Sequence, residues 1–168
     1  GKDVILVEKM PIVGGNTIRA TGGINAAGTT VQKELGIEDS VDLHYEDTMK
    51  GGYYKNDPVL VRTLAENAAD AVEWLISIGA DLSDVGRLAG ASANRAHRPT
   101  GGAAVGSHIV QVLKENCEKE NIEILLETKA KKIIYENNEV KGIVVEDKDG
   151  NEYKIFAKAV ILATGGFG

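Results

Sequence analysis

A glycine-rich segment near the start of the chain is the feature that most constrains its fold. The sequence GGNTIRATGGINAAG runs from Gly14 to Gly28, and asparagine, threonine and arginine side chains interrupt its glycines. A flexible linker is one explanation. However, glycine also lets the main chain approach a bulky ligand closely, because no side chain intervenes. We therefore interpret this segment as backbone that is shaped to lie against a ligand.

Two apolar segments predict buried strands of a parallel sheet. DVILVE at 3–8 is β-branched without alternation, which is typical of a strand covered on both faces, and it ends at Glu8. AVILATGG at 159–166 has the same character and ends at Thr164 and Gly165. Between these two lie the segments IEILLE, AKKIIYE, EVKGIVVED and NEYKIFA, with turn signals at 137–138 and 149–150. This order predicts an α/β fold in which parallel strands flank an antiparallel meander.

Three segments have helical patterns. Asp39 and Ser40 open the first, which stops at the glycines 51–52. Asp57 and Pro58 are typical of a helix start. The apolar residues expected on the inward face of this helix, which recur at helical spacing until Gly79, are Val61, Leu64, Ala65, Ala68, Val72, Leu75 and Ile76. The third helix follows residue 106. Its expected apolar face consists of Val105, Ile109, Leu113 and Cys117.

Composition limits the classes of protein. With 168 residues and 43% hydrophobic content, the chain suits one globular domain or a large piece of one. Its net charge of −6 argues against nucleic acid or an anionic membrane as the main partner, and no apolar stretch is long enough to span a membrane. The single cysteine, Cys117, excludes an internal disulfide, and we expect it in the core and expect no metal site. Periplasmic, extracellular and cytoplasmic locations all remain open.

The segment from 81 to 106 is predicted to be a long irregular loop. It gathers positive charge in an otherwise acidic chain, and loops of this length are usually functional or disordered. Anion binding and a mobile, solvated crossover are both compatible with the pattern. The charged residues are Arg87, Arg95, His97 and Arg98.

Glu8 fits one part of a dinucleotide-binding sheet. An acidic residue at the end of the second strand of such a sheet binds ribose hydroxyls, whereas a glycine fingerprint after the first strand contacts the pyrophosphate. No GxGxxG follows a strand in this chain, so we expect that βα unit to lie upstream. A solvated glutamate at a strand end remains the alternative for Glu8.

Several longer stretches together resemble a known family. Glu8-Lys9, the glycines at 14–15 and 22–23, and the ATGG at 163–166 occur with DTMKGG, GADLSDVGR and NRAHRPTGGAAVGSH. Over essentially all 168 residues, the chain resembles the flavin-binding part of the fumarate reductase and succinate dehydrogenase flavoproteins, particularly the soluble flavocytochrome c type. The resemblance implies part of a Rossmann-like FAD-binding domain with an inserted meander. Its fingerprint unit, cap domain and C-terminal part would lie outside residues 1–168.

The resemblance also implies roles for individual residues. Glu8 would bind the adenosine ribose beside Lys9, and Ala130 would touch the adenine side. Gly22 would contact both flavin and substrate, while Leu88 would sit at the edge of the substrate pocket; core packing is the alternative for Leu88. The remaining residues implied at the cofactor are Gly14, Gly15, Asn16, Thr17, Gly23, Thr164 and Gly165.

Asn16 departs from the pattern of the membrane-bound relatives. Those relatives carry a histidine, covalently linked to the flavin, at the position that Asn16 occupies when the TGGINA segments are aligned. Asparagine cannot form that bond. The resemblance therefore implies noncovalent FAD.

The chemistry implied is hydride transfer from flavin N5 to fumarate or a similar unsaturated acid. The implied partners are a dicarboxylate such as fumarate or succinate and an electron donor such as a haem or flavin domain. Catalytic residues would lie beyond Gly168, and Arg95, His97 and Arg98 are given no proton-transfer role. The isolated chain is expected to bind FAD weakly, to be inactive, and either to dimerise or to rearrange its first segment. The alternative is a noncatalytic α/β module that binds an anion or a partner protein through residues 85–106.

Overall fold

The structure is a computed structural model that describes residues 3–166 of the chain. It divides into two compact units. One unit is Thr17–Val112, and the other combines the chain up to Asn16 with the chain from Leu113 onward. Each unit has its own strands, and each is described by itself below.

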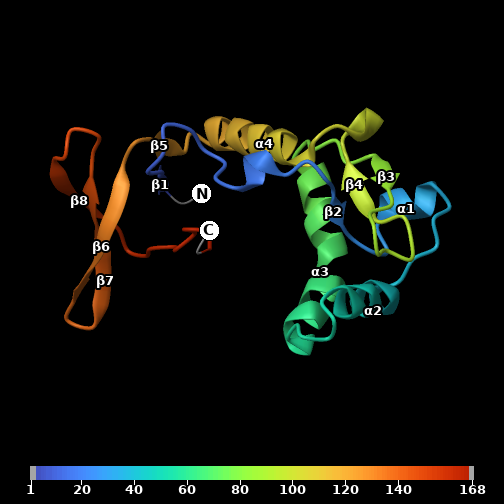
Figure 1. Ribbon diagram of the computed structural model, residues 1–168. Coiled ribbons are helices and arrows are strands. Elements are labelled where there is room, and N and C mark those ends of the chain that lie inside the picture. Colours follow the sequence, from blue (N-terminus) through green and yellow to red (C-terminus); the bar gives the residue numbers. More distant parts are fainter. Residues whose placement is uncertain (1–2, 167–168) are drawn as a thin grey trace. The chain divides into compact units, whose positions relative to one another are not determined.

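The Thr17–Val112 unit is built on helices whose ends follow the predicted signals. α2 (Val41–Gly51) begins where the Ser40 side chain accepts a hydrogen bond from the Leu43 amide. α3 (Pro58–Ser77) begins where Asp57 accepts from the amides of Val59 and Leu60. α2 lies beside α3 (Figure 1). Both helix predictions are confirmed. The helix starts were predictable because capping depends only on a few neighbouring residues.

The core of this unit forms where α3 meets the first half of α4 (Val105–Lys119). Residues three, four or seven apart on α3 face inward, as the helical period requires. The expected faces need two corrections. Leu64 on α3 is exposed, and on α4 Val112 is buried together with Val105 and Ile109, whereas Leu113 is exposed and Cys117 is only partly buried. The core consists of Ala26, Ala68, Val72, Leu75, Ala80, Leu82, Val105, Ile109 and Val112.

A small antiparallel sheet replaces the irregular loop that the sequence predicted. Its order is β2 (Ile24–Asn25), β4 (Ala96–Arg98) and β3 (Asp84–Gly86). Two 3₁₀ turns, η1 (Thr17–Arg19) and η2 (Thr100–Gly102), and the short helix α1 (Thr30–Glu34) complete the unit. Strands of two or three residues are too short for an alternation pattern, which is why the sequence did not reveal them.

The other unit contains a parallel pair and a meander. β1 (Ile5–Val7) pairs in parallel with β5 (Glu123–Leu125). β6 (Lys129–Glu136), β7 (Glu139–Glu146) and β8 (Glu152–Phe156) form the predicted antiparallel sheet (Figure 1). Asn137 and Asn138 both have positive φ, as a two-residue hairpin between β6 and β7 requires. The meander prediction is therefore confirmed.

Two strand predictions for this unit need correction. β1 forms, but Ile5 and Leu6 are exposed rather than covered on both faces. Residues 159–163 form no strand, and Ile161 and Leu162 are 91% and 70% exposed. Burial of an apolar strand depends on layers packed against it, and the described residues give β1 a single strand partner, β5.

Candidate cofactor site

The end of β1 lies against the segment that leads into β6. The Glu8 amide donates to the Leu125 carbonyl at 2.9 Å, and the Glu8 carbonyl accepts from the Thr128 amide at 2.9 Å. The Met10 carbonyl accepts from the Glu127 amide at 3.1 Å. Ala130 follows two residues after Thr128, exposed on β6 beside an irregularity in the β6–β7 register. The structure thus brings Glu8 and Lys9 near Ala130, the three residues implied on the adenosine side.

The Glu8 carboxylate keeps one oxygen available. Its Oε1 accepts a hydrogen bond from the Met10 amide at 2.8 Å, which holds the half-buried side chain in place. Oε2 accepts no hydrogen bond from the residues that the structure describes. A carboxylate oriented in this way can accept from a ligand hydroxyl.

The glycine turn after β1 leaves its backbone open. Gly14 and Gly15 have φ of 117° and 50°, a region that favours glycine. A Cβ built on Gly15 would meet no atom within 4 Å, so neighbouring side chains do not fill this space. Asn16 beside it is exposed, as are Thr164 and Gly165 near the other end of the unit. The open turn fits a ligand that packs on main chain and accepts from its amides.

The second group of predicted residues belongs to the Thr17–Val112 unit. A Cβ on Gly22 would lie 3.8 Å from Leu88 Cδ1, so the two residues implied at the substrate are neighbours. Gly23 has a packing reason of its own: a Cβ there would come within 2.9 Å of the His97 carbonyl oxygen and 3.0 Å of Ala96. Thr17 is the first residue of η1, which ends three residues before Gly22 in the sequence.

Gly106 was missed by the sequence analysis. A Cβ at this position, in the first turn of α4, would collide with the Thr17 carbonyl oxygen and come within 2.8 Å of the Ala20 carbonyl oxygen. The Gly106 amide donates to that Ala20 oxygen at 2.9 Å. The start of α4 therefore packs directly against the backbone of the glycine-rich segment.

Arg95 forms a buried ion-pair network with Asp39 and Asp47. Arg95 donates from Nε and Nη2 to the two carboxylate oxygens of Asp39, at 3.0 and 2.9 Å. It also donates from Nη1 to the Asp47 carboxylate at 2.9 Å. Gln32 adds hydrogen bonds to Asp39 (3.0 Å) and to the Asn94 carbonyl (2.8 Å). Charged groups in a protein interior need such partners, because burial removes their hydration. The network fixes the chain before β4 to α1 and α2.

Charges in the network shift the ionisation of its members. Burial opposes ionisation of Asp47, yet hydrogen bonds from Ser92 and the Arg95 charge hold its pKa below the usual range. Burial and the Arg95 charge lower the pKa of His44, against the opposing pull of Asp39 and Asp47. His44 Nδ1 is buried without a hydrogen-bond partner among the described residues. Neutral His44 is therefore the form that suits this environment.

The cationic side chains of residues 85–106 are engaged by this unit itself. Arg95 is paired as described, and Arg98 donates to Asp84 at 2.9 Å. Arg87 Nε donates to the Ala91 carbonyl at 2.8 Å, and His97 is fully buried. This arrangement differs from an open anion-binding loop, because the charges already have partners.

The sequence analysis did not predict that Asp39 and Asp47 belong to the buried ion-pair network around Arg95. The pattern indicates Asp39 only as part of a helix start, and it does not single out Asp47. One usable signal was the capping box from Thr29 to Gln32, in which Thr29 Oγ1 accepts from the Gln32 amide and Gln32 Oε1 accepts from the Thr29 amide. That signal would have revealed α1 and the place of Gln32.

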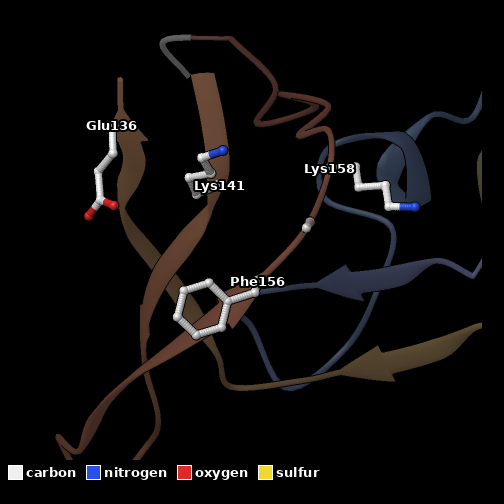
Figure 2. A pocket seen from close by; sticks show the side chains of 5 residues that line it. Glu136, Lys141, Phe156 and Lys158 are labelled. Carbon is white, nitrogen blue, oxygen red and sulfur yellow. The ribbon is translucent and has the colours of Figure 1, made fainter. Parts of the chain in front are cut away.

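A surface hollow of about 450 Å³ lies beside the meander. It is lined by Glu136 of β6, Lys141 of β7, Phe156 at the end of β8, and Ala157 and Lys158 after β8 (Figure 2). None of the predicted cofactor residues lines this hollow.

Among the described residues, no helix has the length and apolar character needed to cross a bilayer. In the same part of the chain, no group of three or more histidine, cysteine or acidic side chains could hold a metal ion.

Comparisons with known proteins identify the family. The family model described as "FAD binding domain" matches residues 1–168. The chain therefore belongs to the FAD-binding domain family, and the predicted fold class and family resemblance are confirmed.

Two curated relatives are reductases of fumarate. The chain is 52% identical to "Fumarate reductase (cytochrome)" of Shewanella frigidimarina, over 99% of this chain and 29% of that protein. It is 42% identical to "NADH:fumarate oxidoreductase" of Klebsiella pneumoniae, over 99% of this chain and 18% of that protein. The chain thus spans less than a third of the length of these relatives.

A solved structure has the same fold. The open conformation of a flavocytochrome c3 fumarate reductase matches with a TM-score of 0.90 and 44% identity, over 100% of this chain and 30% of that one. The resemblance to fumarate reductase flavoproteins is therefore found in both sequence and structure.

Proposed function

We propose that the chain is the FAD-binding portion of a flavoprotein oxidoreductase that reduces fumarate or a similar unsaturated carboxylic acid. The observation that carries this proposal is the 52% identity, across 99% of the chain, to a fumarate reductase. The open glycine turn and the adjacency of Gly22 and Leu88 support it. We thus propose, for the whole protein that contains this chain, the fumarate reduction that gives the full-length relatives their names.

The residues of the β1 unit would hold the cofactor. Glu8 Oε2 would accept from the adenosine ribose beside Lys9, and the backbone near Ala130 would border the adenine. Amides of Gly14, Gly15 and Asn16, and the amide of Thr17 at the start of the other unit, would donate to the pyrophosphate and ribityl chain. Thr164 and Gly165 would close over the cofactor from the other end of the unit. Carboxylate and amides supply acceptor and donors, which is the pattern that a nucleotide needs.

The residues of the Thr17–Val112 unit would shape the reaction site. When bound, FAD would supply the redox chemistry, which is proposed to be hydride transfer to the alkene carbon of the acid. The backbone at Gly22 and Gly23 would face the flavin ring, and the Leu88 side chain would press on the acid. No residue of this chain is assigned a proton-transfer role, and the proposed proton donor lies beyond Gly168.

We propose that the FAD is held noncovalently, because Asn16 has no side-chain atom able to form the histidine type of flavin link. The electron donor would be a haem or flavin domain, and the dicarboxylate would be fumarate or succinate.

The isolated chain would be a poor flavin binder, inactive and prone to pair with itself. Exposed apolar side chains on β1 and at Ile161 and Leu162 support this proposal, since uncovered strand edges and apolar patches favour association. Gel filtration of the isolated chain tests it: a dimer without flavin is expected, and a monomer that retains flavin would contradict it.

The noncatalytic module is not favoured, because the cationic side chains of residues 85–106 that it would use are already partnered.

The experiment uses the protein that contains this chain, purified without added flavin. We expect visible flavin absorbance, and we expect fumarate to reoxidise a reduced viologen dye only when the protein is present. A colourless protein that is inactive with fumarate would contradict the proposal. A yellow protein that is inactive with fumarate but active with another unsaturated acid would keep the class and change the substrate.

A further inference from the structure

His97 lies buried directly beneath the glycine segment. It is fully buried at the centre of β4, where it pairs with Ile24 of β2. Its ring Nδ1 lies 2.9 Å from the Arg95 carbonyl oxygen and 3.2 Å from the Ile24 carbonyl oxygen. Its Nε2 lies 2.8 Å from Thr29 Oγ1. Both ring nitrogens are therefore used inside the unit.

The partners assign the position of the ring hydrogen. Both neighbours of Nδ1 are carbonyl oxygens, which only accept, so Nδ1 carries the hydrogen and donates. Thr29 Oγ1 accepts from the Gln32 amide at 3.1 Å, and its own hydrogen can then be donated to His97 Nε2. Every polar atom of the ring is satisfied in this arrangement, so the ring bridges β2, β4 and the start of α1.

The backbone next to His97 packs tightly against the glycine-rich segment. A Cβ on Gly23 would come within 2.9 Å of the His97 carbonyl oxygen, so the glycine segment rests on β4 without an intervening side chain. The Ala26 amide donates to the Arg95 carbonyl at 3.0 Å, and the Arg95 side chain is anchored by Asp39 and Asp47. The support beneath residues 23–26 is therefore rigid and buried.

We propose that His97 is a positioning residue, which fixes the main chain at Gly22 and Gly23 in the place from which it contacts flavin and acid. This inference rests on the proposed function. His97 touches neither ligand in this account and acts through the Ile24 carbonyl and the Thr29 cap. Reaction geometry is sensitive to displacements of about 1 Å, so loosening this support is expected to affect turnover or substrate binding.

The test compares variants that remove different contacts. His97→Leu removes both ring contacts, and His97→Asn keeps a donor at the place of Nδ1. Thr29→Val removes the hydroxyl that meets Nε2 and also caps α1, and it provides a milder variant if His97→Leu does not fold. Ile134→Ala, at a buried position on β6, is the control, because it lowers stability in the other unit and lies outside the core against which Ile24 packs.

Two measurements are made on the protein that contains the chain. The first is amide hydrogen exchange of the peptide covering residues 22–26, with no substrate present. We expect faster exchange in His97→Leu and Thr29→Val, near-unchanged exchange in His97→Asn, and no local effect in Ile134→Ala. The second is steady-state kinetics with fumarate, in which we expect kcat/KM to fall about tenfold in His97→Leu and to be largely retained in His97→Asn.

Each result bears on the inference. Unchanged exchange at residues 22–26 in both His97→Leu and Thr29→Val would overturn it. Faster exchange with kinetic constants equal to those of Ile134→Ala would also overturn it, because the segment would then be loosened without consequence for the reaction. Failure of the proposed function is seen separately, as an unmodified protein that lacks flavin and activity.

Discussion

The guanidinium of Arg95 and the carboxylate of Asp39 form a two-pronged hydrogen-bonded pair, with side chains that are 2% and 0% exposed. We expect Arg95→Met to destabilise the protein by about 3–5 kcal/mol, because it leaves a buried carboxylate without its partner. Urea unfolding of the purified protein measures this change.

Arg62→Met is the matched control for that variant. Arg62 pairs with Asp42 at 2.6 Å, but the Asp42 side chain is 85% exposed, so water replaces the lost partner. A change in stability as large in Arg62→Met as in Arg95→Met would contradict the account of the buried network.

Stability is expected to fall as the pH drops below about 6.5. Burial and the Arg95 charge lower the pKa of His44 below its ordinary value of 6.5, so the unfolded chain binds a proton before the folded one does. The contribution of His44 is therefore fully present above the unfolded pKa and is lost as the pH falls toward the folded pKa. Melting temperatures between about pH 7.5 and pH 5.5 measure this dependence.

His44→Gln isolates that contribution. The variant keeps the other histidines and the neighbouring Asp39, Asp47 and Arg95, so it should show a flatter pH dependence than the unmodified protein. Equal slopes in the two proteins would show that His44 is not the group responsible.

Gly15→Ala is expected to weaken flavin binding about tenfold or more, because a methyl group would enter the open space where the cofactor is proposed to lie. In the absence of flavin its cost is limited to the left-handed backbone, about 1 kcal/mol. Gly28→Ala has the same open surroundings and a φ of 86°, which makes it a matched control outside the proposed site. Flavin titration of both variants checks this; equal affinity in the two would argue against a cofactor at Gly15.

Leu88→Ala is expected to lower kcat/KM for the acid about tenfold while flavin content stays unchanged, because the proposed apolar contact with the substrate is lost. Leu64→Ala, at an exposed position on α3, controls for loss of a leucine side chain. Steady-state kinetics with fumarate distinguishes the two. If Leu88→Ala retains full activity, Leu88 is a packing residue only.

Local signals predicted the helices and the meander well. Ser40, Asp57 and Pro58 fix helix starts through bonds to amides two or three residues away, and the turn at Asn137 and Asn138 sets its hairpin in the same local way. Such interactions are complete within a few residues, so the sequence contains all the information needed to predict them.

Features that depend on distant partners were not predicted. Arg95 and Asp39 are 56 residues apart, and nothing local in either indicates that they meet in the interior. The exposure of β1 and the absence of a strand at 159–163 have the same origin, because an apolar segment does not specify which layer covers it. Among the candidate site residues, Gly22 lies beside Leu88 and Glu8 is hydrogen-bonded to the segment before Ala130, while the roles that the resemblance implied for these residues stay predictions.

The FAD content of the protein that contains this chain tests the central claim most directly. We predict an equimolar amount of FAD in the purified protein, all of it released into solution when the protein is denatured by acid, since Asn16 cannot hold it covalently. A protein that takes up no flavin when titrated with FAD would contradict the claim that these glycine segments form a flavin site. Flavin that stays with the denatured polypeptide would contradict the assignment of Asn16.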